Sequence, residues 1–380
     1  MSQGVAILGS TGSIGRSALR VLGRHPDRFA VKALTAYGSR DLLLEQAKEC
    51  GAPYVCLVGE HGSPDGADAP YGTGPECLVE AAMHPEVSIV INAIVGAAGL
   101  RATLAALRAG KRVALANKES LVMAGDLVTR AARDGGGEIV PVDSEHSAVL
   151  QCLSGRSVEE VRRLVLTASG GPFREWSRDR LRDVTVEEAL RHPTWDMGPK
   201  ITVDSATLVN KALEVIEAHY LFKLGYGRID VVVHPQSIVH GFVEFTDGSV
   251  LAQVGVPSME LPILYALTHP ARLDDDGTPR FDPVTAGTLT FEPVRRDDFP
   301  AFAIGVSAGT VGGTAPAVYN ASNEVAVQAF LDGRIPFRAI AEILRGVLES
   351  HDVQPATDVE AVLAADAWAR QRGELLCSSR

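Results

Sequence analysis

Two carboxylates stand one residue apart at the end of a short apolar strand near the middle of the chain. Asp143 and Glu145 follow the run Val140-Pro-Val142, and side chains at i and i+2 of extended backbone leave on the same face. Both could therefore bind one hard cation from one side. An acidic first turn behind a helix N-cap is an equally simple interpretation. A third ligand must come from elsewhere, and Glu214 on a predicted helix is the candidate.

The helix that carries Glu214 also offers groups that could bind an anion. Asn210 and Lys211 stand four and three residues before Glu214, so the three side chains project over neighbouring turns. Together with Ser169 and Ser205 they could hold a phosphate, assisted by a helix N-terminus. An exposed lysine–glutamate pair of little energetic value is the alternative.

A glycine-rich turn near the amino terminus predicts a nucleotide site. Gly9-Ser-Thr-Gly12-Ser-Ile-Gly15 follows a buried-strand run at residues 4–9, opens a helix and is followed by a strand near residues 29–35. This strand–turn–helix–strand unit is typical of dinucleotide binding, in which N–H groups at the helix start hold a pyrophosphate. The spacing is G-x-x-G-x-x-G rather than G-x-G-x-x-G, so the context carries the prediction and a plain tight turn is the alternative.

The end of the second strand favours NADP over NAD. An NAD site would place an acid there for the ribose 2′-hydroxyl, whereas a 2′-phosphate needs small polar groups and a cation. The sequence has Gly38, Ser39 and Arg40, with an acid only at Asp41. Ser39 and Arg40 are the candidate 2′-phosphate contacts. Arg40 could instead be a solvated residue in the first turn of the next helix.

Two further stretches fall where strands of a parallel sheet end, which is where such sheets bind ligands. Asn92 to Gly99 forms a strand-to-helix turn that could pass beneath the cofactor, and Asn117-Lys118-Glu119 follows the strand near residues 112–116. A lysine beside a carboxylate could reach a substrate oxygen there. An exposed helix start is the competing interpretation.

Residues 169–199 are predicted to form a lid. A glycine pair after Ser169 opens this polar segment, Gly198-Pro closes it, and Trp195 and Met197 lie near its tip. Hinged ends and an aromatic tip suit a loop that closes over substrate, although a long surface loop fits the same pattern.

The elements that must position these residues predict an α/β fold in three parts. Strands and helices alternate first, as in a doubly wound (Rossmann-like) parallel sheet. An α+β catalytic and dimerisation domain follows, with a predicted meander of strands and one predicted helix at about 204–222. A small α-helical domain ends the chain, in which the polar run from Asn320 to Glu324 is either a helix start or a wall of the cleft. The predicted boundaries are 1–143, 144–268, a linker at 269–297, and 298–380, and the strands of the meander lie at about 230–234, 239–245 and 249–255.

Composition excludes several classes of function. A net charge of −11 over 380 residues argues against nonspecific binding to nucleic acid or anionic membranes. No apolar run reaches membrane-spanning length, so a cytoplasmic protein is expected. The cysteines are five in number without C-x-x-C spacing, which indicates neither a disulfide framework nor a zinc site.

These groups together suit metal-assisted reduction of a phosphorylated hydroxy-ketone or aldehyde. A cation that chelates two vicinal oxygens polarises a carbonyl, while a nicotinamide delivers hydride to the polarised carbon. Ligands that offer only oxygen favour Mg²⁺ or Mn²⁺ over zinc.

The sequence also closely resembles the 1-deoxy-D-xylulose 5-phosphate reductoisomerase family over essentially its whole length. The resemblance implies an NADPH-dependent homodimer that needs one divalent cation, Mn²⁺ or Mg²⁺ with Co²⁺ as a further candidate. It implies conversion of the phosphorylated sugar 1-deoxy-D-xylulose 5-phosphate to 2-C-methyl-D-erythritol 4-phosphate in isoprenoid precursor synthesis. The motifs that carry it are Gly9-Ser-Thr-Gly-Ser-Ile-Gly15, Ala116-Asn-Lys-Glu119, Val142-Asp-Ser-Glu-His146, Ser169-Gly-Gly-Pro-Phe173, His192-Pro-Thr-Trp195, Asp204-Ser-Ala-Thr207, Asn210-Lys-Ala-Leu-Glu214 and His234-Pro-Gln-Ser237.

The resemblance also implies a role for each matching residue. Its metal ligands fall on Asp143, Glu145 and Glu214, and its catalytic groups on Lys118, Glu145 and His192. The substrate contacts fall on Lys118, Ser144, Glu145, Ser169, His192, Ser205, Asn210, Lys211 and Glu214, with Trp195 and Met197 in the lid. The cofactor contacts fall on Gly9, Thr11, Gly12, Ser13, Ile14, Gly15, Asn117, Glu119 and Gly198, and the loop Tyr37-Gly38-Ser39-Arg40 matches less closely.

Three other functions share parts of this pattern. A ketol-acid reductoisomerase also combines NADPH, Mg²⁺ and carboxylates, but its substrate carries no phosphate. A metal-free NADP sugar dehydrogenase would use Asn117-Lys118-Glu119 without a cation. A nonenzymatic NADP-sensing protein would tolerate the loss of Asp143 and Glu214.

Overall fold

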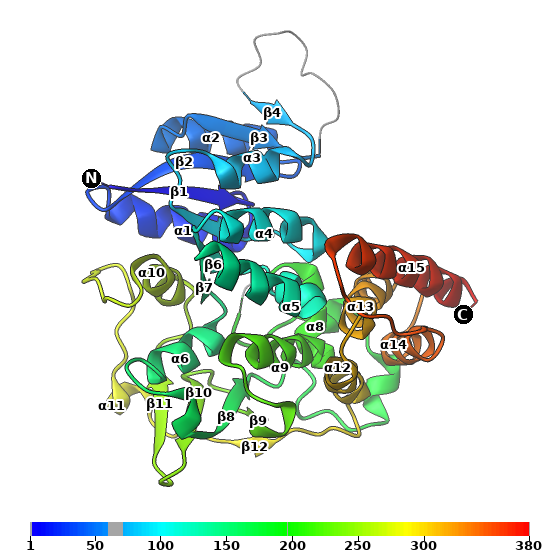
Figure 1. Ribbon diagram of the computed structural model, residues 1–380. Helices are drawn as coiled ribbons and strands as arrows, with labels where there is room; N and C mark the ends of the chain where they lie inside the picture. The colour runs from blue at the N-terminus through cyan, green and yellow to red at the C-terminus, as the bar shows by residue number, and fades with distance from the viewer. Residues whose placement is uncertain (1, 60–70, 196, 380) are drawn as a thin grey trace. The chain divides into compact units, whose positions relative to one another are not determined.

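A parallel sheet organises the amino-terminal part of the chain, and its strands are the buried apolar runs of the sequence. The computed structural model describes residues 2–59, 71–195 and 197–379. Within these residues, seven strands pair in the order β4-β3-β2-β1-β5-β6-β7 (Figure 1). Every neighbouring pair in this sheet is parallel. The strands are β1 (Gln3–Leu8), β2 (Phe29–Ala36), β3 (Tyr54–Leu57), β4 (Gly72–Thr73), β5 (Ile89–Asn92), β6 (Arg112–Leu115) and β7 (Glu138–Pro141).

The strand order places a topological switch point beside the glycine-rich turn. From β1 the chain moves outward to β4 and then returns to β5 on the other side of β1, and such sheets bind ligands at the carboxyl ends of the strands where the order reverses. The helices of this region are α1 (Ser13–Arg24), α2 (Arg40–Cys50), α3 (Cys77–Met83), the short η1 (Gly96–Gly99), α4 (Leu100–Arg108), α5 (Lys118–Gly135) and α10 (Glu260–Thr268).

By its internal contacts the chain divides into two units. The first comprises residues 1–120, 128–147 and 258–279, and the second 121–127, 148–257 and 280–380. The segment at 258–279 joins the first unit because Arg24 on α1 binds Asp275 (2.8 Å) and Glu260 (2.9 Å), and because α10 packs against α1, β6 and β7. The division into four parts that the sequence suggests remains a prediction.

One expectation about the cysteines is wrong. Cys56 at the end of β3 and Cys77 at the start of α3 are joined as a disulfide, with their Cα atoms 6.2 Å apart. The two residues are separated by 21 positions in the sequence, so no local spacing motif reveals a pair that the tertiary fold brings together. The other three cysteines, Cys50, Cys152 and Cys377, form no disulfide with any residue that the structure describes.

The second unit contains a mixed sheet of five strands within the described residues, in the order β11-β10-β8-β9-β12. The predicted meander is wrong in its pairing, because β8 lies between β9 and β10. The chain leaves β8, passes through helices and returns as β9 parallel to it, which is a crossover connection rather than a hairpin. The strands are β8 (Val161–Ala168), β9 (Ile229–Val233), β10 (Val239–Phe245), β11 (Val250–Val254) and β12 (Glu292–Pro293).

Helices form the rest of the second unit and confirm the predicted helical carboxyl terminus. Helix α13 packs against α12, α14 and α15, and its Asn320, Ser322 and Asn323 are completely buried in mid-helix, so the predicted helix start there is wrong. The elements are α6 (Ser144–Cys152, shared with the first unit), η2 (Val158–Glu160), η3 (Arg180–Asp183), α7 (Val186–Ala189), α8 (Pro199–Thr207), α9 (Val209–Phe222), η4 (Tyr226–Arg228), α11 (Pro283–Ala286), α12 (Pro300–Val311), α13 (Ala315–Leu331), α14 (Ala339–Glu349) and α15 (Val359–Ser378).

The helix predicted at about 204–222 is broken in two. Leu208 lies in the left-handed region at φ 61°, where it ends α8 and precedes α9. A leucine gives no sequence signal for such a break, because a glycine or asparagine is the usual residue at positive φ.

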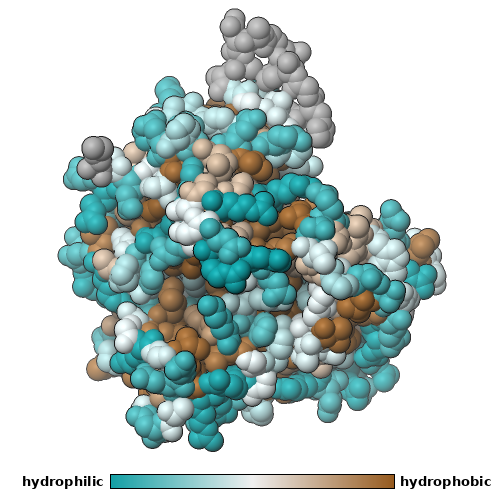
Figure 2. Space-filling model, viewed as in Figure 1, coloured by the Kyte–Doolittle hydropathy of each residue, from teal (hydrophilic) through white to brown (hydrophobic). Residues whose placement is uncertain are grey.

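Polar and apolar side chains are mixed on the surface. The face shown in Figure 2 is largely hydrophilic with scattered hydrophobic patches, which is ordinary for a folded chain. Among the described residues, no helix combines the length and apolar character needed to cross a membrane.

Candidate active site

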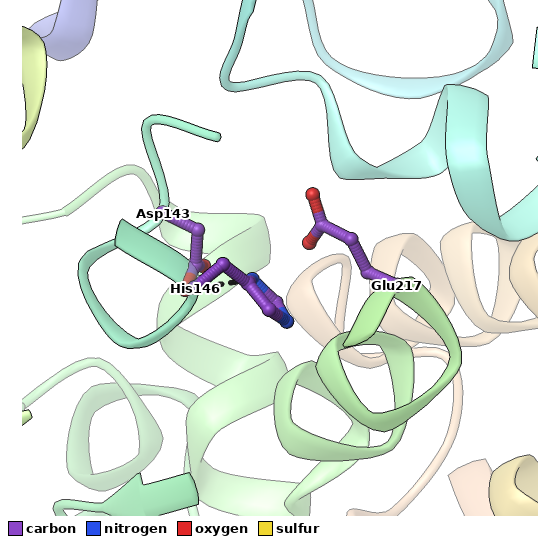
Figure 3. Close-up of side chains that lie close together, drawn as sticks. All are labelled: Asp143, His146 and Glu217. Atoms are coloured by element: carbon purple, nitrogen blue, oxygen red, sulfur yellow. Dashed lines mark ion pairs between the residues drawn. The ribbon is translucent and has the colours of Figure 1, made fainter. Parts of the chain in front are cut away.

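In the first unit, Asp143 is held at the junction between β7 and α6. Its carboxylate accepts from Lys118 Nζ at 2.6 Å and from the backbone N–H of Glu145 at 3.2 Å, and His146 Nδ1 lies 3.2 Å from it. Figure 3 shows the contact between Asp143 and His146 as a dashed line. The Lys118 and Asp143 side chains are only 9% and 11% exposed, so the Lys118–Asp143 ion pair is well shielded from water.

The extended backbone assumed between Asp143 and Glu145 is wrong. Helix α6 begins at Ser144, so Glu145 lies in its first turn, where a negative charge is favoured by the helix dipole. The capping interpretation is thus realised, since Asp143 accepts from the N–H of Glu145. The Glu145 carboxylate accepts from Ser144 Oγ at 2.6 Å.

Asn117, Lys118 and Glu119 are buried, so the alternative of an exposed helix start is wrong. Asn117 donates to the carbonyls of Ile94 (2.7 Å) and Gly96 (2.9 Å) and to Glu119 (3.1 Å). It therefore ties the end of β6 to the turn after β5. Lys118 and Glu119 are 7% and 6% exposed, and a buried lysine beside acids at a strand end is typical of a site rather than of a solvated surface.

The glycine-rich turn has the shape that a dinucleotide needs. Gly9 has φ +87°, and a Cβ on it would lie 2.9 Å from the carbonyl of Ala93. A Cβ on Gly15 would lie 2.3 Å from the carbonyl oxygen of Gly9, so glycine allows α1 to pack closely against the turn. Gly12 precedes the first residue of α1, Ser13, and both are exposed, with Thr11 and Ile14 half-buried beside them. The start of α1 can thus be reached by an anion.

The predicted 2′-phosphate contacts lie after β2. Gly38 is exposed, Ser39 takes the N-cap position of α2, and Arg40 is the first residue of that helix. Arg40 is exposed, as the alternative interpretation stated, and its guanidinium lies 5.3 Å from the ring centre of Tyr71.

In the second unit, His192 is joined to Ser169. His192 Nδ1 accepts from the backbone N–H groups of Thr194 (3.1 Å) and Trp195 (2.9 Å). The proton of the neutral ring therefore lies on Nε2, which is 3.0 Å from Ser169 Oγ and donates to it. Burial lowers the pKa of His192 to about 4, so the ring is neutral at pH 7.

The start of α9 carries a buried polar cluster. Asn210 Nδ2 donates to Glu214 at 2.5 Å, and Lys211 forms an ion pair with the same carboxylate. The side chains of Lys211 and Glu214 are 4% and 1% exposed, so the alternative of an exposed lysine–glutamate pair is wrong. Ser205, half-buried on α8, lies just before the left-handed turn at Leu208 that leads into this cluster.

The predicted lid contains short helical turns rather than extended loop. Trp195 and Met197 are half-buried, and Gly198 takes the N-cap position of α8. Asp196 of this segment lies outside the described residues. The closing movement of the segment remains a prediction.

Comparisons with known proteins cover nearly the whole chain. Three family models match: 1-deoxy-D-xylulose 5-phosphate reductoisomerase at residues 5–125, its C-terminal domain at 139–222, and the DXP reductoisomerase C-terminal domain at 254–372. The enzyme of that name from Heliobacterium modesticaldum is 50% identical over 98% of this chain and 96% of its own length. That from Mycobacterium tuberculosis is 53% identical over 97% of this chain and 89% of its own. The chain belongs to the 1-deoxy-D-xylulose 5-phosphate reductoisomerase family.

Solved structures of this reductoisomerase family share the fold. The Zymomonas mobilis enzyme in complex with NADPH covers 100% of both chains at 41% identity, with a TM-score of 0.91. A DOX-P reductoisomerase in complex with NADPH, fosmidomycin and magnesium covers 99% of this chain and 98% of its own at 40% identity, with a TM-score of 0.92. The family resemblance, the fold class and the assignment as an NADP-dependent enzyme are thus confirmed.

Sequence reasoning missed three polar groups in this member of the reductoisomerase family. Asp204 is 1% exposed, pairs with Lys200 at 2.9 Å and accepts from Asn323 at 2.7 Å. His146 and Glu217 are completely buried in their respective units, and Figure 3 draws both. The i+3 spacing of His146 from Asp143 and of Glu217 from Glu214 was the available signal, because such spacing places side chains on one helix face.

Proposed function

We propose that the chain converts 1-deoxy-D-xylulose 5-phosphate to 2-C-methyl-D-erythritol 4-phosphate with NADPH and a divalent cation, in isoprenoid precursor synthesis by the non-mevalonate pathway. The observation that carries this function is the match, over nearly the whole of both chains, to a family structure that holds NADPH, fosmidomycin and magnesium. A cytoplasmic location is part of this proposal.

For the divalent cation we propose Asp143, Glu145 and Glu214 as ligands. All three offer carboxylate oxygens, the donors that Mg²⁺ and Mn²⁺ prefer. Lys118 forms an ion pair with Asp143, and Lys211 forms an ion pair with Glu214, so two of the three proposed ligands are held in place by an ammonium group. This donor set fits a hard divalent ion and does not suit a soft metal.

For the substrate phosphate we propose Ser169, His192, Ser205, Asn210 and Lys211. The Lys211 ammonium supplies charge, and the serine hydroxyls and the Asn210 amide supply directional donors. Neutral His192 presents N–H only at Nε2, so it donates to Ser169 or to a phosphate oxygen without adding charge.

The reacting part of the substrate is assigned to Lys118, Ser144 and Glu145. When bound, NADPH supplies a hydride and the cation polarises the carbonyl that receives it. Lys118 donates from its ammonium to a substrate oxygen, and Glu145 accepts from a substrate hydroxyl. Trp195 and Met197 exclude water from the bound substrate.

NADPH is assigned to the glycine-rich turn at the switch point of the parallel sheet. Gly9, Gly12 and Gly15 with Thr11, Ser13 and Ile14 would hold the pyrophosphate, and Ser39 and Arg40, after Gly38, the 2′-phosphate. Asn117 and Glu119, which hold the turn after β5, would meet the nicotinamide half together with Gly198.

The enzyme's phosphate requirement is tested directly by substrate choice. NADPH oxidation should be rapid with 1-deoxy-D-xylulose 5-phosphate and fall by about three orders of magnitude or more with the dephosphorylated sugar, because several charge-assisted hydrogen bonds are lost. Equal rates with both would favour a reductoisomerase or dehydrogenase whose substrate carries no phosphate.

The assembly is proposed as a homodimer formed through the outer face of the five-stranded sheet. Leu164 and Val243 on the inner face belong to the buried core, whereas Val165, Phe242 and Ala252 lie side by side in register on the outer face. These three residues are half-buried or exposed, and Phe291, 43% exposed, packs on Phe242. An open apolar face of this kind is typical of an interface between copies.

The dimer is tested by its mass. Phe242→Asp should place charge in the interface and halve the mass measured by light scattering, whereas Val311→Asp, at a 59% exposed valine on α12, should leave the mass unchanged. A wild-type monomer, or a Phe242→Asp dimer as stable as the wild type, would contradict this surface.

A further inference from the structure

A cavity of about 640 Å³ lies in the second unit, lined by the segment around η3 and by the starts of α12 and α14. This volume is within the range of pockets that enclose small molecules. None of the residues proposed above for substrate, cofactor or cation lines it. The cavity is therefore a separate feature of this unit rather than part of the active site.

The rim of the cavity is rich in arginine. Arg178, Arg296, Arg338 and Arg345 line it, and all four side chains are exposed. Arg178, Arg338 and Arg345 form no ion pair with any residue that the structure describes. Guanidinium groups without a carboxylate partner at the rim of an open pocket favour phosphate, which they bind in a bidentate manner.

Three acids share the lining and reduce its charge without cancelling it. Asp298 is held by Arg295 at 2.5 Å, so its charge is already compensated from outside the cavity. Asp297 and Glu342 are the other two acids of the lining, which also carries four guanidinium groups. Helix α12 starts at Pro300 and α14 starts at Ala339. These two helix N-termini add partial positive charge to the lining of the cavity.

The floor of the cavity is apolar. Leu181, Phe299, Ala301 and Phe337 line it and are all less than 7% exposed. A basic rim above an apolar floor selects a molecule that has an anionic head and an apolar body. We propose that this cavity binds a small phosphorylated amphiphile, a class distinct from the hydrophilic sugar phosphate of the active site.

The position of the cavity suggests how its ligand would act. Thr207 also lines it and is the last residue of α8, two residues after Ser205 and next to the left-handed turn at Leu208. A ligand packed against Thr207 would bias the turn that presents Ser205 and Asn210, and so change KM for the phosphorylated substrate. This coupling rests on the proposed function, whereas binding itself does not.

Binding is tested by calorimetric titration of the full chain with phenyl phosphate. The Arg338→Ala/Arg345→Ala variant loses two charge-assisted contacts to the phosphate. It should therefore either bind one equivalent of phenyl phosphate fewer than the wild type or bind it at least about tenfold more weakly. Arg182→Ala, at a 64% exposed arginine of the same segment that does not line the cavity, should bind as the wild type does. Ala303→Trp should block the cavity while keeping its charges, since Ala303 is an exposed lining residue.

The outcomes separate the claims. Identical titrations of wild type, Arg338→Ala/Arg345→Ala and Ala303→Trp, including no binding by any of them, would overturn the site. Inorganic phosphate that binds as tightly as phenyl phosphate would overturn the amphiphile assignment. Binding that is confirmed but leaves KM unchanged would overturn only the coupling to Ser205.

Discussion

At the scale of single residues, the site is built from buried charges that neutralise one another. Lys211 and Glu214 were singled out as a pair from their spacing, and the structure buries that pair. Lys118 and Asp143 were singled out separately, and the structure shows that they also form a buried pair. What the sequence could not show is burial itself, because an exposed pair on a helix has the same spacing. His192 had no local signal at all, since its role depends on Ser169, which lies 23 positions away.

The Lys211–Glu214 pair should show strong coupling in a double-mutant cycle. Lys211→Met alone leaves a buried carboxylate uncompensated and should cost about 3–5 kcal/mol in the free energy of unfolding, whereas adding Glu214→Gln should recover part of that loss. Urea unfolding in the presence of EDTA measures each variant. The matched control is Arg191–Glu187, an i,i+4 pair whose side chains are 71% and 76% exposed, and its coupling should stay below about 0.5 kcal/mol.

His192 should remain neutral throughout the physiological range. Its pKa of about 4 in the folded chain lies below the ordinary value of 6.5, so the unfolded state binds more protons between these values. The stability that His192 contributes is thus complete above about pH 6.5 and is lost as the pH falls towards 4. An NMR titration should show no protonation of this ring above pH 6, and a midpoint near pH 6.5 would contradict the proposed hydrogen bonds.

At the scale of elements, the parallel sheet was predictable and the second sheet was not. Buried apolar runs alternating with helical segments predicted the parallel sheet and its glycine-rich turn, whereas the two-residue strand β4 was missed. The insertion of β8 between β9 and β10 depends on long-range pairing, for which hairpin spacing is misleading. The break at Leu208 was equally hidden, because tertiary packing holds a leucine at positive φ.

Two glycines of α1 should respond in opposite ways to alanine. Gly15→Ala places a Cβ 2.3 Å from the Gly9 carbonyl, so the turn must shift and NADPH affinity should fall at least about tenfold. Gly23→Ala meets nothing within 4 Å and should raise the free energy of unfolding by about 0.5–1 kcal/mol with NADPH affinity unchanged. Fluorescence titration and thermal unfolding of both variants give the comparison, and equal effects would argue against a close-packed cofactor turn.

At the scale of the whole molecule, the turn proposed for the cofactor pyrophosphate and the contacts proposed for the substrate phosphate belong to different units. The nucleotide-type turn, Asp143 and Glu145 belong to the first unit, and Glu214 with the phosphate groups to the second. The sequence predicted an early nucleotide half and a later catalytic half, but it gave no signal that residues 258–279 return to the first unit. The ion pairs of Arg24 with Asp275 and Glu260 join positions more than 200 residues apart.

The central claim is that a divalent cation bound by the proposed ligands Asp143, Glu145 and Glu214 serves a reaction whose cofactor contacts lie on other residues. NADPH oxidation with 1-deoxy-D-xylulose 5-phosphate, measured with Mn²⁺ and then with excess EDTA, tests it in the wild type and in Glu214→Gln. The proposal predicts that EDTA abolishes turnover reversibly and that Glu214→Gln is inactive in Mn²⁺, while its NADPH affinity stays within about twofold of wild type. Turnover that survives EDTA, or a folded Glu214→Gln variant that no longer binds NADPH, would contradict it.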